Sequence, residues 1–154
     1  MTRELDQFYM KLAIDLALKG EGQTSPNPLV GAVVIKSGKV IAKGYHKKAG
    51  LPHAETIALR KAGKQSIGAD LFVNLEPCCH HGRTPPCVEA IIEARIKRVV
   101  IGVSDPNNLV NRKSIRLLRK KGIDVVTGVL KKDCERLNES FFKYIRTGRP
   151  FVTL

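Results

Sequence analysis

The sequence predicts an α/β protein, a three-layer α/β/α sandwich built on one mixed sheet of about five strands. A length of 154 residues suits a single domain, and a hydrophobic content of 43% supports one ordinary core. Two apolar runs in the first part of the chain have the pattern of an antiparallel hairpin. From Ala69 onward, short apolar runs alternate with helical patterns, which implies parallel strands joined by crossover helices.

The chain should begin with a helix followed by that hairpin. Apolar side chains recur at helical spacing over residues 4–19, and Gly20 suits the end of this helix. After a turn-rich stretch, residues 29–35 and 40–45 are predicted to form strands joined at Ser37-Gly38. The hairpin supplies the antiparallel part of the sheet.

The middle of the chain should alternate helix, strand and helix. Residues 52–61 have a helical pattern with Pro52 near the first position, where proline is tolerated. Residues 71–75 form a short apolar run typical of a buried strand. Thr84 is expected to cap a following helix that runs to about Ala94 and carries two prolines in its first turn.

The last third of the chain should continue this alternation. Residues 99–103 and 123–129 are predicted strands, and residues 114–121 form a helix between them that ends at Gly122. Residues 131–145 are predicted to form one last helix.

The net charge of +13 is unevenly distributed along the chain. Before Arg95 there are 12 Lys and Arg against 9 Asp and Glu (+3), and from Arg95 onward there are 15 against 5 (+10). A basic half favours an anionic partner, such as a nucleic acid, a phosphorylated metabolite or an acidic protein. A solvated, lysine-rich surface explains the charge equally well, since no aromatic-interleaved RNA motif accompanies it.

No apolar run approaches the roughly 18 residues needed to cross a membrane. The first 12 residues lack the apolar centre of a signal peptide, so a cytoplasmic location is expected. Three of the four cysteines, Cys78, Cys79 and Cys87, lie within ten residues, which favours a metal or catalytic cluster over a disulfide framework. Cys134 stands alone in a helical stretch and is expected to be a packing residue.

The clearest chemical pattern is His53-Ala54-Glu55 followed by Cys78 and Cys87. Catalytic zinc takes three protein ligands and leaves one position open, and one imidazole with two thiolates meets that requirement. Glu55 would move protons at the open position, and His-x-Glu followed by Pro-Cys-x-x-Cys is the signature of zinc deaminases. Here eight residues separate the two cysteines instead of two. His53 and Cys87 should each lie in the first turn of a helix, where a thiolate is stabilised.

Several neighbouring residues are rivals for these roles. Cys79, His80 and His81 are alternative ligands, although adjacent side chains such as Cys78 and Cys79 point apart on an extended chain. Glu76 is an alternative acid/base, but a carboxylate at such a place is more often a structural anchor.

The run Leu75–Cys87, with eight residues between the two ligand cysteines, resembles the deaminase domain of the bifunctional riboflavin-biosynthesis deaminase/reductase. Further matching stretches extend the resemblance over nearly the whole chain: Ser25–Gly31, Gly44–His46, His53–Glu55, Asp105–Asn107 and Phe141–Pro150. The resemblance implies a cytidine deaminase-like fold. It also implies a zinc-dependent hydrolase that acts on a cyclic amidine.

The resemblance implies that 2,5-diamino-6-ribosylamino-4(3H)-pyrimidinone 5′-phosphate is the substrate, which water converts to 5-amino-6-ribosylaminouracil 5′-phosphate and ammonia. Carried onto this sequence, it makes His53, Cys78 and Cys87 the ligands of Zn²⁺ and Glu55 the proton shuttle. The residues that it implies for the substrate pocket are Asn27, His46, His80, Asp105 and Asn107, with Arg83 near the phosphate.

The sequence departs from that family between Asn108 and Ser114, where the family carries a proline and two glycines. Arg112 and Ser114 replace the glycines, so we expect this loop to follow a different path. Arg112 or Lys113 is then an alternative partner for the phosphate. By the same resemblance, residues 1–146 form the deaminase domain, and residues 147–154 form a linker and the first strand of a reductase domain that is absent.

Two other functions are compatible with these residues. One is a tRNA adenosine or nucleotide deaminase of the same fold, which the basic half favours and the long loop between the cysteines disfavours. The other is a zinc-stabilised RNA-binding module without catalysis. The partners expected for the riboflavin enzyme are the phosphorylated pyrimidine, a second copy of the chain and a separate reductase subunit, with neither a membrane nor a nucleic acid.

Overall fold

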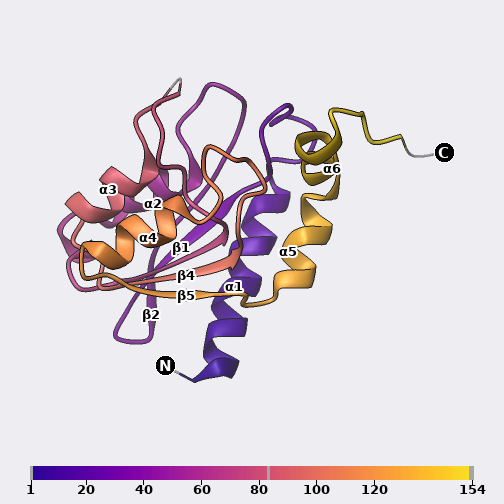
Figure 1. Cartoon of the computed structure of the whole chain (residues 1–154). Coiled ribbons are helices and arrows are strands. Elements are labelled where there is room, and N and C mark those ends of the chain that lie inside the picture. Colours follow the sequence, from indigo (N-terminus) through magenta and orange to yellow (C-terminus); the bar gives the residue numbers. More distant parts are fainter. Residues whose placement is uncertain (1, 83, 153–154) are drawn as a thin grey trace.

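A computed structural model describes residues 2–82 and 84–152 of the chain. A five-stranded sheet with the strand order β2-β1-β3-β4-β5 lies between two layers of helices (Figure 1). The strands are β1 (Gly31–Lys36), β2 (Lys39–Tyr45), β3 (Asp70–Leu75), β4 (Arg98–Val103) and β5 (Asp124–Thr127). The predicted three-layer sandwich on a mixed sheet is confirmed.

Strand pairing follows from the two kinds of connection in the sequence. β1 pairs with its hairpin partner β2 and also with β3, in both cases antiparallel. β3, β4 and β5 are parallel, because a helix crosses over between each pair. Five of the six residues of β3 and of β4 are buried, as expected for central strands that are covered on both faces.

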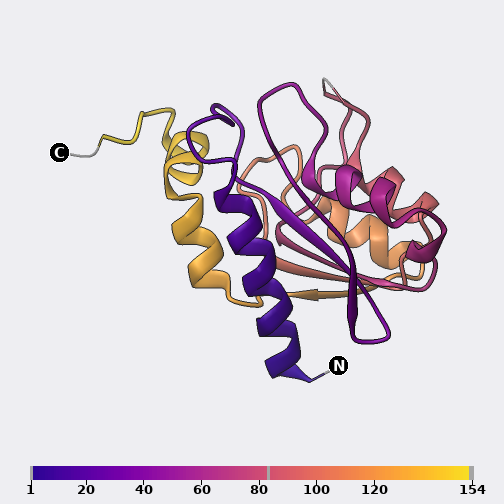
Figure 2. The ribbon, with the colours of Figure 1, turned by 180° about the vertical axis from the view of Figure 1, so that it is seen from behind.

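The helices divide between the two faces of the sheet, as Figures 1 and 2 show from opposite sides. One layer holds α2 (Ala54–Ala62), α3 (Cys87–Glu93) and α4 (Lys113–Lys120), and the other holds α1 (Arg3–Leu18), α5 (Lys131–Leu137) and α6 (Glu139–Thr147). A short 3-10 helix, η1 (Gly63–Ser66), follows α2 and was not expected from the sequence. Separate apolar clusters fill the two interfaces, with Leu71 and Ile91 in the first and Met10 and Phe72 in the second.

The first turn of α2 lies very close to the hairpin. A Cβ atom at Gly44 of β2 would collide with the carbonyl oxygen of Ala54, the first residue of α2. Glycine therefore permits an approach that any side chain would prevent. The approach fixes the start of α2, and with it His53 and Glu55, against the sheet.

The predicted helix over residues 131–145 is wrong in one respect, because it is two helices interrupted at Asn138. The Asn138 side chain is buried and binds the backbone of Leu29 twice: Oδ1 accepts from the N–H at 2.8 Å, and Nδ2 donates to the C=O at 2.8 Å. Asn74 of β3 donates to the same carbonyl at 2.9 Å. These bonds hold the segment before β1 beside α6, and they are long-range contacts that helical periodicity does not contain.

Two other expected boundaries need correction. Thr84 does not cap α3, since Pro86 occupies the N-cap position and makes no side-chain capping hydrogen bond. His53 is the N-cap of α2 and does not lie in its first turn. Cys87 is the first residue of α3, as expected.

The C-terminal segment, over its described residues, adds no regular secondary structure to the fold. Residues 148–152, where the sequence suggested the start of a strand, form neither helix nor strand, and residues 153 and 154 lie outside the described part. Within the described residues, no helix combines the length and apolarity that a membrane crossing requires.

Replacing Asn138 by alanine should lower the free energy of unfolding by about 1–2 kcal/mol, because the backbone N–H of Leu29 loses its partner. Urea denaturation of the variant measures this change. The exposed Asn111 provides the control, and its alanine variant should stay within about 0.5 kcal/mol of the parent. Equal losses in the two variants would contradict the role given to Asn138.

Candidate metal centre and substrate pocket

Three elements bring His53, Cys78 and Cys87 to one edge of the sheet. His53 precedes α2, Cys87 begins α3, and Cys78 lies in the segment that follows β3. The backbone N–H of Val88, in the first turn of α3, donates to the carbonyl of Cys78 at 3.2 Å. The carboxyl end of β3 and two helix N-termini therefore meet at one point, as open α/β sheets commonly arrange their sites.

The donor atoms of these three residues converge. His53 Nδ1 lies 3.2 Å from the sulfur of Cys87 and 3.6 Å from that of Cys78, and all three donor atoms lie within 4.8 Å of one another. Tetrahedral zinc with ordinary bond lengths separates nitrogen and sulfur ligands by about 3.5 Å. The residues thus fit a zinc ion, and the His and Cys donor set suits zinc chemically.

The electrostatics of the cluster favour a cation. The thiol and the backbone N–H of Cys87 both donate towards the sulfur of Cys78, and with His53 they hold the pKa of Cys78 well below its usual range. The pKa of Cys87 is raised, since its thiol keeps the proton that the two sulfurs share and is buried. A divalent metal would displace the proton of Cys87 and neutralise the two thiolates that then lie beside the imidazole.

Two of the three rival ligands, Cys79 and His81, point elsewhere in the described structure. The thiol of Cys79 donates to the carbonyl of Leu109 at 3.7 Å, and the exposed imidazole of His81 lies 3.7 Å from Glu89. Among the described residues, the only convergent group of His, Cys, Asp and Glu side chains is the one formed by His53, Cys78 and Cys87. Cys134 is buried against Gly102 in the opposite layer, so the expectation of a packing residue is confirmed.

Glu55 lies beside the metal ligands in the first turn of α2. Its side chain is buried, and Oε2 finds no hydrogen-bond partner among the described residues. Burial raises the pKa of this carboxyl to about 7. Burying a carboxyl group with an unpaired oxygen costs free energy. Such a group at the floor of a cavity therefore points to a ligand that binds to it.

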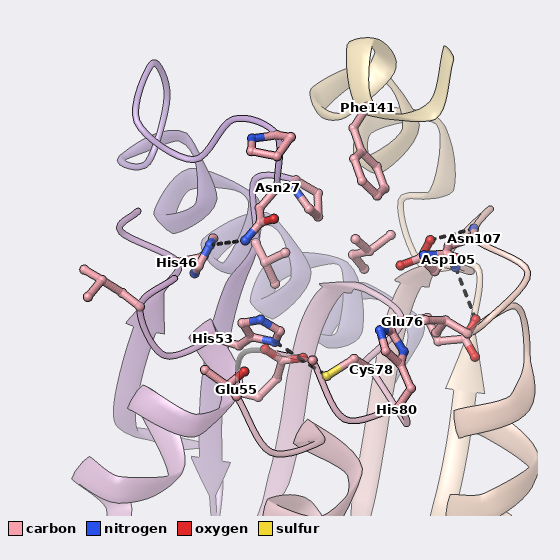
Figure 3. A pocket seen from close by; sticks show the side chains of 18 of the residues that line it. Asn27, His46, His53, Glu55, Glu76, Cys78, His80, Asp105, Asn107 and Phe141 are labelled. Carbon is pink, nitrogen blue, oxygen red and sulfur yellow. Dashed lines mark hydrogen bonds between the residues drawn. The ribbon is translucent and has the colours of Figure 1, made fainter. Parts of the chain in front are cut away.

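The cavity above Glu55 has a volume of about 360 Å³, the size of a small-molecule site. Figure 3 shows His53, Glu55 and Cys78 at its floor, Asn27 and His46 on one wall, and Asp105 and Asn107 on the opposite wall. Phe141 of α6 reaches over it from above. The cavity is therefore built from segments that are distant in the sequence.

The first polar wall is a hydrogen-bonded pair. His46 Nδ1 lies 3.2 Å from the carbonyl of Pro52, and its Nε2 lies 3.1 Å from Asn27 Nδ2. Burial lowers the pKa of His46, which favours the neutral ring. Nδ1 is then the donor to Pro52 and Nε2 the acceptor for Asn27, so the Asn27 side chain is oriented by a chain of two hydrogen bonds.

The second polar wall carries Asp105 and Asn107, and burial raises the pKa of Asp105 to about 6. His80 also lines the cavity, and its Nδ1 atom is buried without a partner among the described residues. Five of the six side chains that the sequence suggested for substrate binding thus border one cavity. The sixth, Arg83, lies outside the described residues.

The altered loop keeps a glycine-like backbone although it has no glycines. Arg112 adopts a left-handed conformation with φ 61°, and the buried hydroxyl of Ser114 donates to Glu76. Arg112 thus adopts a conformation that glycine favours, and the expected difference in path from the family stays a prediction. Arg112 and Lys113 are exposed and are not among the residues that line the cavity.

Phe141 and Val110 were not expected at this site, and Glu76 was expected there in one of two roles. Phe141 and Val110 line the cavity, and Glu76 borders it while accepting three hydrogen bonds from the loop that begins at Asp105. Phe141 lies within a stretch that matched the family, but nothing local distinguishes it from an ordinary helix residue. Glu76 fits the anchoring role that was one of its two interpretations.

Comparison with known proteins supports the geometry. The family model for the cytidine and deoxycytidylate deaminase zinc-binding region matches residues 3–103. The riboflavin biosynthesis protein RibD of Aquifex aeolicus is 55% identical over 154 residues, which are 100% of this chain and 43% of that protein. The chain therefore spans about two fifths of the length of the curated relatives it matches.

Solved structures give the same result. RibD of Acinetobacter baumannii superposes with a TM-score of 0.95 at 47% identity, covering 97% of this chain and 42% of that one. A diaminohydroxyphosphoribosylaminopyrimidine deaminase/5-amino-6-(5-phosphoribosylamino)uracil reductase from Thermotoga maritima superposes with a TM-score of 0.92 at 47% identity, covering 97% and 43%. These matches confirm the resemblance that the sequence motifs indicated.

The geometry predicts which cysteines hold the metal. Serine at Cys78 or at Cys87 should reduce bound zinc from about one ion per chain to a small fraction of that, because a hydroxyl is a far weaker zinc ligand than a thiolate. Cys79→Ser is the matched control and should keep its metal. Elemental analysis of the purified variants measures this, and loss of zinc from Cys79→Ser alone would refute the assignment.

Proposed function

The chain belongs to the cytidine and deoxycytidylate deaminase family, and from this premise we propose that it is a zinc-dependent hydrolytic deaminase. The observation that carries the proposal is the convergence of three metal-binding donor atoms beside a buried carboxyl group that has a vacant acceptor. His53, Cys78 and Cys87 would hold the zinc and leave one position open. A site closed by four protein ligands would have indicated a structural metal instead.

Glu55 is the proton carrier in this proposal. Zinc, when bound, supplies Lewis acidity that lowers the pKa of water to about 7. Glu55 takes one proton from the attacking water and delivers it to a ring nitrogen of the substrate. It then takes the second proton from the hydroxyl that the attack has placed on the ring carbon and gives it to the amine, which leaves as ammonia while the carbonyl forms. Its buried position beside His53 and Cys78 keeps bulk water away from this transfer.

We propose 2,5-diamino-6-ribosylamino-4(3H)-pyrimidinone 5′-phosphate as the substrate, on the strength of the similarity to the Aquifex and Thermotoga proteins. Water replaces the 2-amino group, and the products are 5-amino-6-ribosylaminouracil 5′-phosphate and ammonia. Asn27, His80, Asp105 and Asn107 offer donors and acceptors to a pyrimidine edge. Arg83 is the candidate for the phosphate, because a guanidinium suits that group.

The resemblance and the charge distribution add four further proposals. Relatives of this chain are longer, and one carries a reductase in its name, so residues 147–154 are proposed to lead towards a reductase domain or subunit. Self-association is proposed from the resemblance alone, as is a cytoplasmic location. The basic second half of the chain is proposed to attract the phosphorylated substrate and its phosphorylated product rather than RNA.

Purified protein should release ammonia from the diaminopyrimidine phosphate and not from tRNA. Activity on tRNA alone would instead favour the RNA deaminase. Ammonia release is measured by a coupled assay under matched zinc loading. Binding of RNA without deamination of either substrate would favour the non-catalytic module.

Glu55→Gln should reduce turnover by about 10²–10⁴-fold while zinc content stays unchanged, because an amide cannot carry the proton. Glu93→Gln, an exposed residue in the same helical layer, is the control and should retain parental turnover. Full activity in Glu55→Gln would rule out its role as the proton carrier.

A further inference from the structure

We propose that Glu76 and Ser114 are positioning residues that hold the loop over residues 105–112 against the cavity and thereby set the affinity for the substrate. The inference rests on the proposed deaminase function for its kinetic consequence. Its structural consequence, the rigidity of the loop, can be measured without any substrate.

Glu76 is a bridge between the sheet and both ends of the loop. It follows β3 directly, its backbone N–H donates to Val103 of β4 at 2.9 Å, and its side chain is buried. Oε1 accepts from the Ser114 hydroxyl at 2.5 Å. Oε2 accepts from the backbone N–H of Arg112 at 2.9 Å and from that of Asp105 at 3.2 Å.

The loop has its own local structure, but that structure does not fix it to the sheet. The backbone N–H of Asn107 donates to Asp105 Oδ1 at 2.8 Å, and that of Leu109 donates to Asn107 Oδ1 at 3.0 Å. Such short-range bonds shape a turn without deciding where the turn lies. Asp105, Asn107 and Val110 of this loop line the cavity, on the wall where Figure 3 shows Glu76. Glu76 therefore holds that wall through three hydrogen bonds, and the long contact of the Cys79 thiol with the carbonyl of Leu109, at 3.7 Å, adds to them.

The loop also contains a residue, Arg112, whose backbone would move to a more favourable conformation if Glu76 no longer held it. Arg112 has φ 61°, a left-handed conformation that is unfavourable for any residue with a Cβ atom. Such a conformation persists only where surrounding contacts impose it. Here Glu76 binds the N–H of Arg112 itself and the hydroxyl of Ser114 two residues later. Ser114 is fully buried at the start of α4, so this bond is shielded from water.

Ser114→Ala tests the proposal in two independent ways. Hydrogen exchange is measured in the zinc-loaded protein without substrate. At the amides of Asp105 and Arg112 it should accelerate by about tenfold, because the bond from Ser114, one of the three through which Glu76 holds the loop, is lost. In the assay, KM should rise by about tenfold while kcat changes by less than about threefold, since the metal ligands and Glu55 are untouched.

Ser66→Ala is the matched control. Ser66 is also buried and also donates its hydroxyl, to the carbonyls of Gly63 and Ala94, but it lies in η1 and does not line the cavity. This variant should leave both amides and KM unchanged. Unchanged exchange in Ser114→Ala, or equal effects in the two variants, would overturn the proposal. Absence of deamination in the parent protein would refute the proposed function, and the exchange measurement would still decide whether Glu76 and Ser114 fix the loop.

Glu76→Gln separates positioning from proton transfer. Glutamine keeps an oxygen for the two backbone N–H groups and offers an amide that donates to the Ser114 hydroxyl. Exchange should therefore remain near the parental rate, and turnover should fall by less than about tenfold. A loss of about 10²-fold or more in kcat, with unchanged exchange, would make Glu76 an acid/base and refute the positioning role.

Discussion

The site depends on a single structural constraint, the meeting of two helix N-termini with the carboxyl end of β3. Each of these three chain segments contributes one donor atom, from His53, Cys87 and Cys78. Because α2 is held against β2 by a close approach at Gly44, and α3 is tied to Cys78 through Val88, the three donors converge on one point.

Two buried glutamates at the cavity illustrate how environment assigns roles to identical side chains. Glu55 has an oxygen without a partner among the described residues, so it remains available to a ligand. Glu76 accepts three hydrogen bonds from the loop beside it, so its acceptors are already used. The first arrangement suits proton transfer, which needs a free acceptor, and the second suits fixing a wall.

The walls of the cavity are held by amide side chains that act over long sequence distances. Asn74 and Asn138 both bind the backbone of Leu29, which places the turn that carries Asn27. The same contacts with Asn138 interrupt the last helix and set α6 at the angle from which Phe141 enters the cavity. The wall that carries Asn27 is thus supported from the opposite helical layer, while the metal side is supported from the layer of α2 and α3.

The sequence by itself determined the sandwich, the hairpin, the parallel strands and the three convergent donors of the proposed metal centre, because alternation, helical spacing and a chemical motif are local properties. Tertiary structure alone decided the break at Asn138 and the anchoring role of Glu76, since each depends on partners at least 29 residues away. It also decided that Arg112 keeps a left-handed backbone without glycine. The physical reason is that a hydrogen bond between distant segments leaves no periodic trace in either of them, whereas burial of one face of a helix or strand repeats with every turn or pleat.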